Sequence, residues 1–313
     1  MLLISLASTN ADIQKIVAFV GAFDKLFNII SLEGGLASGG IVVQDCLAGL
    51  VGLLRYNPSN QNYFRETSCI PHLTPLLQFP PHALIDPTES INPPNPSQLS
   101  AEAQHGLAAF AQQYWPEQKA TNAQLVLGLV RMLVGGAGEG RSMNAKALLQ
   151  SGLTRCLLEL SLASNAPTSL KAHALNALAD LFKGSPPNQD LLTNLWVQPL
   201  IPVFPNGGDD EQQEEAQIDW QRAQPVPAIL ALIALAVQGD PGLGMDASGP
   251  HGLQVRAAAV ALFEVSSLVS YEEDRRTQRI SRATLPTIQM LKYQSFRKWL
   301  RLQRNQINHF LVS

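Results

Sequence analysis

One unit of about forty residues, 39–77, limits what this chain can fold into more than any other feature. Apolar side chains in its first half recur every three or four residues, the spacing of one helix face; they are Val43, Leu47, Leu50 and Leu54. Pro58 then ends the helix, because a proline disfavours the helical backbone of the residue before it. A second apolar segment follows at 70–77, so we predict a long helix, a turn and two shorter helices. This unit cannot bury its apolar face alone.

Copies of the second half of this unit recur along the chain, each marked by two apolar residues nine positions apart. The pairs are Val17 and Leu26, Phe64 and Leu73, Leu148 and Leu157, and Leu192 and Ile201. The copies start 47, 84 and 44 residues apart, and periods of about 40–47 residues are typical of stacked armadillo or HEAT repeats. The long interval equals one repeat plus a loop. We therefore predict an all-α chain, a right-handed solenoid of armadillo/HEAT-like helical repeats.

The strongest internal match aligns the chain with itself at a constant offset of 128 positions, from Asp45 and His173 onward. Proline, asparagine and glutamine recur at matching turn positions; the pairs are Pro58 and Pro186, Asn60 and Asn188, and Gln61 and Gln189. Asparagine stabilises turns through hydrogen bonds to its own backbone. We therefore predict that these Asn and Gln residues form turns and do not contact partners.

The segment GGIVVQDCLAGLVGLLRYNPSNQNYFRE, with VGAFDKLFNIIS before it, resembles the armadillo-like globular head of the general vesicular transport factor family. The similarity continues through WPEQKATNAQLVLGLVRMLV, ALLQSGLTRCLLEL, NALADLFKGSPPNQDLL and QVRAAAVALFEV, and covers roughly residues 13–265. The stretch 41–64 is its specific part. The family has further repeats before the point where Met1 falls, and a coiled coil and acidic tail after the head. We therefore expect a fragment of that head, with apolar ends that self-associate.

This resemblance implies a non-enzymatic protein-binding scaffold for vesicle tethering in endoplasmic reticulum to Golgi and intra-Golgi transport. By resemblance, its partners would be Rab-type GTPases, SNARE proteins of vesicle fusion and components of tethering complexes. The family is cytoplasmic and peripheral on Golgi and transport-vesicle membranes, and its full-length members are homodimers. No cofactor and no nucleic-acid partner is expected.

Three surface insertions are predicted from runs rich in proline, glycine or acidic residues. They are 79–116, 205–224 and 239–252, and they interrupt a repeat array that we expect to occupy residues 1–274. Residues 275–313 hold nine Lys and Arg residues and no acid, whereas the chain before them carries a formal charge of −12. We interpret this basic segment as a degraded repeat or an altered end. A basic amphipathic helix for a membrane surface or an acidic partner is the alternative.

Composition supports a soluble globular chain, with 46% apolar and 15% charged residues. No apolar run is long enough to predict a membrane span. Cys46, Cys69 and Cys156 lie far apart within apolar runs. They are predicted to be buried free thiols of a protein in a reducing compartment, because a disulfide framework needs cysteines in pairs.

The long helix of each repeat would line the concave face of such a solenoid, where an extended binding surface is expected. Helical phase places eight polar side chains outward on these helices. They are Asp45, Arg55, Gln124, Arg131, His173, Asn176, Asp180 and Lys183. This face is the predicted partner-binding surface, and ordinary solvent exposure of the same residues is the alternative.

Patterns that would indicate other functions are incomplete. Residues 135–142 imitate a phosphate-binding loop, but the motif needs lysine where Arg141 stands and a strand where 124–134 has helical period. The six histidines have no metal-ligand spacing, and no group orients a nucleophile, so no catalytic residue or metal site is predicted. Another armadillo adaptor would carry a ladder of Trp and Asn on its long helices. The four tryptophans, Trp115, Trp196, Trp220 and Trp299, do not follow such a ladder.

Overall fold

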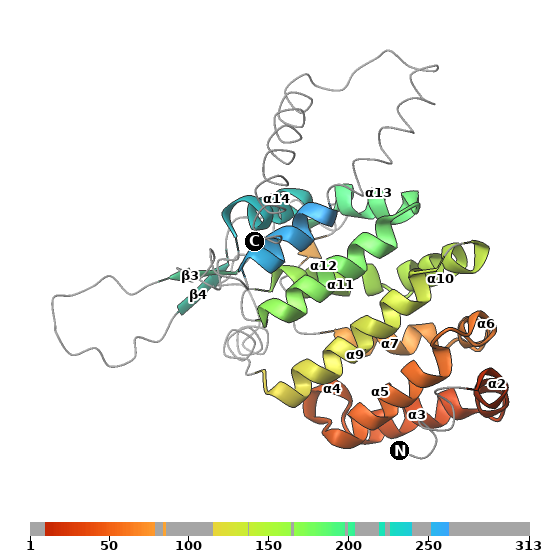
Figure 1. The fold of residues 1–313 in the computed structure, drawn as a ribbon. Helices are drawn as coiled ribbons and strands as arrows, with labels where there is room; N and C mark the ends of the chain where they lie inside the picture. The colour runs from red at the N-terminus through yellow and green to blue at the C-terminus, as the bar shows by residue number, and fades with distance from the viewer. Residues whose placement is uncertain are drawn as a thin grey trace, which may run out of the picture.

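The computed structural model describes residues 10–78, 84–85, 115–136, 138–163, 166–197, 200–203, 219–222, 226–239 and 252–262. The basic segment 275–313 lies outside these ranges, as do most of the predicted insertions 79–116, 205–224 and 239–252. Their assignment as insertions stays a prediction. In the described part of the chain, α-helices stack in successive layers, as Figure 1 shows.

Each layer consists of shorter helices followed by one long helix. The first contains α2 (Ala11–Phe19), α3 (Ala22–Leu32), α4 (Gly35–Ser38) and α5 (Ile41–Leu54). The second contains α6 (Pro58–Glu66), a 3₁₀ turn (Ile70–His72), α7 (Leu73–Leu77) and α9 (Glu117–Val134). The third contains α10 (Glu139–Gln150), α11 (Leu153–Leu162) and α12 (Thr168–Phe182). The armadillo-like helical solenoid predicted from the repeat period is thereby confirmed.

The last layer departs from the repeat pattern. It contains α13 (Pro186–Asn194), α14 (Ala228–Gln238) and a helical segment at 252–262. Between α13 and α14 lie the short strands β2 (Trp196–Val197), β3 (Leu200–Val203), β4 (Asp219–Arg222) and β5 (Val226–Pro227). The strand β2 pairs antiparallel with β5 and with β1 (Leu84–Ile85), which follows α7, and β3 pairs antiparallel with β4. Ile201, predicted to anchor another helical copy, therefore lies in a strand. Pro202 next to it lacks the backbone N–H that a continuing helix requires.

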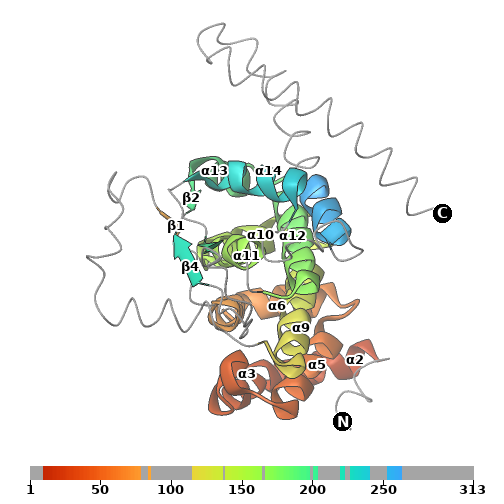
Figure 2. The same cartoon turned by 90° about the vertical axis from the view of Figure 1, so that its left-hand side faces the viewer.

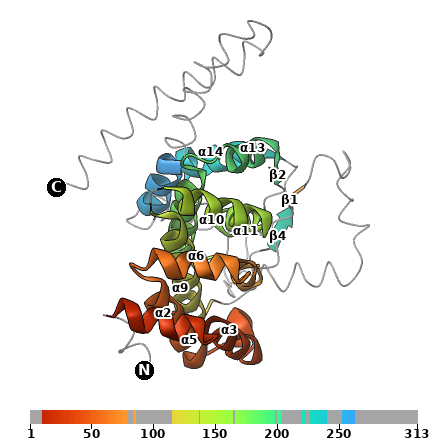
Figure 3. The same cartoon turned by 90° about the vertical axis from the view of Figure 1, so that its right-hand side faces the viewer.

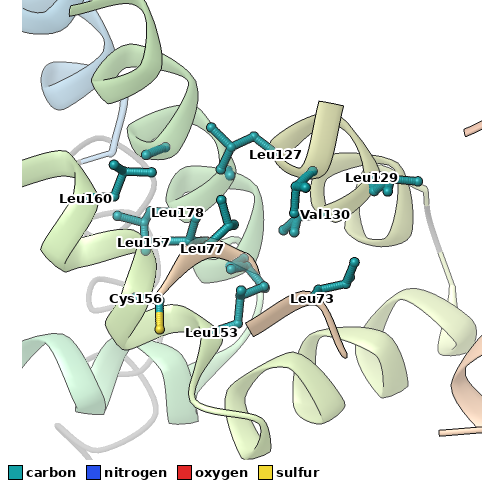
Figure 4. Close-up of a cluster of buried hydrophobic side chains, with 14 of the residues drawn as sticks. Leu73, Leu77, Leu127, Leu129, Val130, Leu153, Cys156, Leu157, Leu160 and Leu178 are labelled. Atoms are coloured by element: carbon teal, nitrogen blue, oxygen red, sulfur yellow. The ribbon is translucent and has the colours of Figure 1, made fainter. Parts of the chain in front are cut away.

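The core is continuous from layer to layer. Figure 4 shows leucines of α7, α9, α11 and α12 meeting in one cluster, among them Leu77, Leu127, Leu157 and Leu178, each at most 1% exposed. Because every layer buries its apolar face against the next, stability is shared along the stack. The helix α9 begins at Glu117, earlier than the segment 124–134 predicted from periodicity, and Gln118 in its first turn donates a hydrogen bond to Gln44 of α5.

The cysteines are buried in this core as free thiols, as predicted. Burial raises the pKa of Cys46 and Cys69, and it raises the pKa of Cys156 to about 11. All three thiols are therefore protonated and unreactive near neutral pH.

The backbone carbonyl of the last residue of each long helix accepts a hydrogen bond from the side chain of the residue seven positions later. Gln61 Nε2 donates to Leu54 O at 3.1 Å, and Gln189 Nε2 donates to Phe182 O at 2.7 Å. The buried Asn60 also donates to Leu53 O at 2.8 Å. These residues lie inside α6 and α13 and do not form the turn itself, which differs from the prediction. Their side chains instead satisfy carbonyls at the end of the preceding long helix that have no partner within that helix.

Candidate partner-binding face

The long helices α5, α9 and α12 lie side by side and run in the same direction. At their starts, Gln118 Nε2 of α9 donates to Gln44 Oε1 of α5 at 2.7 Å, and the buried Asn122 donates to Gly39 O at 3.2 Å. At their ends, Arg131 of α9 contacts Asp180 of α12. Figure 2 shows these helices above one another along one side of the molecule, with α3, α10 and α11 beside them on the left of the view. Figure 3 shows the opposite arrangement, with α6, α10 and α11 in front.

Several of the predicted face residues are brought together where α9 and α12 meet. Arg131 Nε lies 2.8 Å from Asp180 Oδ2, with 44% and 32% of the two side chains exposed. Toward the helix starts, Gln124 Nε2 donates to Ser169 Oγ at 3.4 Å. Asn176 is half-buried on the same helix as Asp180. The two helices thus present one polar strip, and these two contacts join its halves on α9 and α12.

His173 lies within this strip and is half-buried. Burial lowers the pKa of His173, and the positive charge of Arg131 lowers it further. Its Nδ1 atom is buried without a hydrogen-bond partner in the described ranges. The imidazole is therefore neutral near pH 7, and protonation would place a second positive charge beside Arg131.

The remaining predicted residues lie toward the edges of this face. Asp45 is half-buried on α5, and Arg55 is exposed directly after that helix. Lys183 is exposed directly after α12. Arg55 and Lys183 carry positive charge at helix C-termini, which stabilises the helix dipole.

The helix α9 ends at Val134 and α10 begins at Glu139, so a helix and not a strand precedes the glycine-rich residues 135–142. The Arg141 side chain is turned back into the fold: Nε donates to Val134 O at 2.7 Å and Nη2 donates to Asp180 O at 2.7 Å. Nη2 also donates to Lys183 O. The guanidinium group therefore ties the end of α9 to the end of α12. Sequence reasoning missed this role, although Arg141 stands seven residues after Val134, the spacing that Gln61 keeps from Leu54.

A cavity of about 570 Å³ lies between the first two layers, among α3, α4, α7 and the start of α9. Its wall is mainly apolar, with Phe27, Ile30 and Leu76, and it includes Lys119. Burial lowers the pKa of Lys119, whose ammonium lies 4.9 Å from the centre of the Trp115 ring. No pattern in the sequence pointed to this cavity, because it is assembled from segments of two layers.

Two further observations bear on the chemistry of the described ranges. No helix there is both long and apolar enough to cross a membrane. In the same residues, no three His, Cys, Asp or Glu side chains are grouped as metal ligands would be.

The fold and this polar face place the chain among helical-repeat proteins of the armadillo-like kind. No family model matches it. It is 34% identical to the human general vesicular transport factor p115 over 197 residues, which is 62% of this chain and 17% of p115. It is 29% identical to the intracellular protein transport protein USO1 of Saccharomyces cerevisiae over 213 residues, 66% of this chain and 10% of USO1. The chain is thus a relative of the p115 and USO1 transport factors, as its sequence indicated, and spans less than a fifth of their length.

Solved structures agree with this fold. Two crystal structures of Uso1 superimpose on 88% of the chain with a TM-score of 0.60 and 24% sequence identity. The aligned region is about a third of those chains, 34% and 35%. At this level of identity the match supports the armadillo-like architecture alone.

Proposed function

We propose that this chain is a non-enzymatic scaffold that binds proteins during vesicle tethering between the endoplasmic reticulum and the Golgi. Its relatives are described as vesicular and intracellular protein transport factors, which favours transport over chemistry. The single observation that carries the location of binding is the polar strip on α9 and α12, held by the Arg131–Asp180 ion pair. A strip that crosses repeats and stays partly exposed is the kind of surface on which solenoids bind partners.

The partners we propose are a Rab-type GTPase, SNARE proteins and components of other tethering complexes. The chain would act on the cytoplasmic side, peripheral to Golgi and vesicle membranes, in a homodimeric full-length protein. Asp45, Arg55, Gln124, His173, Asn176 and Lys183 would contribute to the contact together with Arg131 and Asp180. The mixed charge of this set favours a partner with a similarly mixed polar surface.

A different armadillo adaptor is the second candidate, and the positions of tryptophan disfavour it. Trp115 precedes α9, Trp196 lies in β2 and Trp220 lies in β4. None of these three is on α5, α9 or α12, where a Trp–Asn ladder would have to stand. Trp299 lies outside the described residues.

The direct test is binding of the purified chain to a purified Rab-type GTPase, loaded either with a non-hydrolysable GTP analogue or with GDP, and to SNARE cytosolic domains. We expect saturable binding that Lys183→Glu weakens about tenfold, the effect of a moderately important interface charge. Lys146→Glu, at an exposed position of α10 away from the polar strip, is the matched control and should bind normally. No binding to any of these proteins, or equal effects of the two substitutions, would contradict the proposal.

A further inference from the structure

Tyr56 lies two residues after the end of α5 and has an unfavourable backbone conformation. Its φ angle is 55°, in the left-handed region, where side chains with a Cβ crowd the backbone. Its side chain is 92% exposed, so the ring gains almost nothing from burial. Backbone strain of this kind persists where the surrounding structure imposes it and is often found at functional positions.

The repeat itself shows that the turn does not require a tyrosine. At the offset of 128 positions, Leu54 and Phe182 are the last residues of α5 and α12, and the residue two positions later is Tyr56 in one copy and Gly184 in the other. Gly184 has φ 69°, nearly the same conformation. Glycine adopts this conformation without crowding. The turn is therefore built with glycine in one copy, and folding does not account for the tyrosine in the other.

Arg55 gives this tyrosine a charged neighbour. The Arg55 guanidinium lies 5.9 Å from the centre of the Tyr56 ring, within cation–π distance. Both side chains are exposed, so the contact orders them without burying either. The result is an aromatic face and a positive charge presented together at the end of α5.

At the C-terminal ends of the three long helices, positively charged residues outnumber negatively charged ones. The three long helices run in the same direction, so their C-terminal ends lie on the same side of the molecule. Arg55 follows α5 there, Arg131 lies in the last turn of α9, and Lys183 follows α12. Asp180 neutralises Arg131 through their ion pair. Arg55 and Lys183 remain as exposed cations, which favours a partner with negative charge.

We propose that Arg55 and Tyr56 form the anchor of a protein contact at the C-terminal end of α5. The partner segment would present a carboxylate to the guanidinium and an adjacent apolar side chain to the ring. Tyrosine and arginine dominate the binding energy of many interfaces, and a carboxylate is the natural counterpart of a guanidinium. This inference rests on the proposed function only in assuming that the partner is a protein.

The experiment uses the full chain and a phage-displayed library of random dodecapeptides. Selection on the wild-type chain should enrich peptides with Asp or Glu next to an aliphatic or aromatic residue. The enriched peptides are then synthesised and their affinities are measured by fluorescence anisotropy. We expect Tyr56→Asn and Arg55→Gln each to weaken binding about tenfold or more, as loss of an interface anchor does.

Asparagine is chosen because it tolerates the left-handed conformation, so this substitution should not lower the melting temperature. Leu32→Asn and Lys25→Gln remove an apolar and a basic side chain at exposed positions of α3 and should leave peptide affinity unchanged. Failure to enrich acidic–apolar peptides, undiminished affinity of the Arg55 or Tyr56 variants, or a lowered melting temperature of Tyr56→Asn would overturn the proposal. Its outcome is independent of binding to GTPases or SNARE proteins, so either proposal can fail alone.

Discussion

Arg131 on α9 and Asp180 on α12 form an ion pair of 2.8 Å between residues 49 positions apart. Helical phase predicted that each would face outward, and their contact shows that the faces of two successive repeats form one surface. Both side chains are partly exposed, so the pair orients the strip more than it stabilises the fold.

The first prediction concerns that pair. Arg131→Gln and Asp180→Asn should each lower the free energy of unfolding by less than about 1 kcal/mol, because solvent screens an ion pair at this exposure. Urea denaturation of the two single variants and the double variant gives the coupling energy. A coupling energy of several kcal/mol, unaffected by added salt, would show that the pair is a structural element and not a surface contact.

The second prediction concerns Arg141. Arg141→Ala removes the donor for carbonyls at the ends of two helices, and we expect a loss of about 2–3 kcal/mol of unfolding free energy. Ser142→Ala, at the exposed neighbouring position, is the control and should change stability by less than about 0.5 kcal/mol. Equal stability of the two variants in urea would mean that the guanidinium contacts contribute nothing to the fold.

The third prediction concerns the pH dependence of His173. Its pKa in the folded protein lies below the ordinary value of 6.5, so the unfolded chain takes up its proton first as the pH falls. The stability it contributes is full above pH 6.5 and is lost as the pH falls through the folded pKa. His173→Gln should flatten this part of the curve of unfolding free energy against pH. A variant curve parallel to that of the wild type between pH 5 and 7 would disprove this.

The fourth prediction has the opposite sign. Burial on α11 raises the pKa of Glu159 from 4.5 to about 7, with a smaller opposing effect of Arg155. Its contribution to stability is full below pH 4.5 and is lost as the pH rises to about 7. Glu159→Gln should therefore raise the free energy of unfolding, relative to the wild type, more at pH 8 than at pH 5. We expect the two effects to differ by about 1–2 kcal/mol after allowance for solvent screening. Urea titrations of the wild type and the variant at the two pH values measure this difference.

The sequence by itself determined the repeat architecture. The spacing of apolar residues placed α5 and most of α9, and it placed Arg131 and Asp180 on outward faces, because helical phase is a local property that needs only neighbours three or four positions away. The buried cysteines were also accessible, since they depend on local pattern. The recurrence of Asn60 and Gln61 predicted a turn, whereas their bonds to the carbonyls at the end of α5 came only from the structure.

Only the tertiary structure decided how the layers join. Arg141 binds carbonyls at the ends of both α9 and α12, Ile201 lies in a strand paired with β4, and the cavity beside Lys119 takes its wall from two layers. Tyr56 in its left-handed turn also became evident only beside Gly184 in the same conformation. These features depend on contacts between residues tens of positions apart, whose geometry is set when the helices pack against one another.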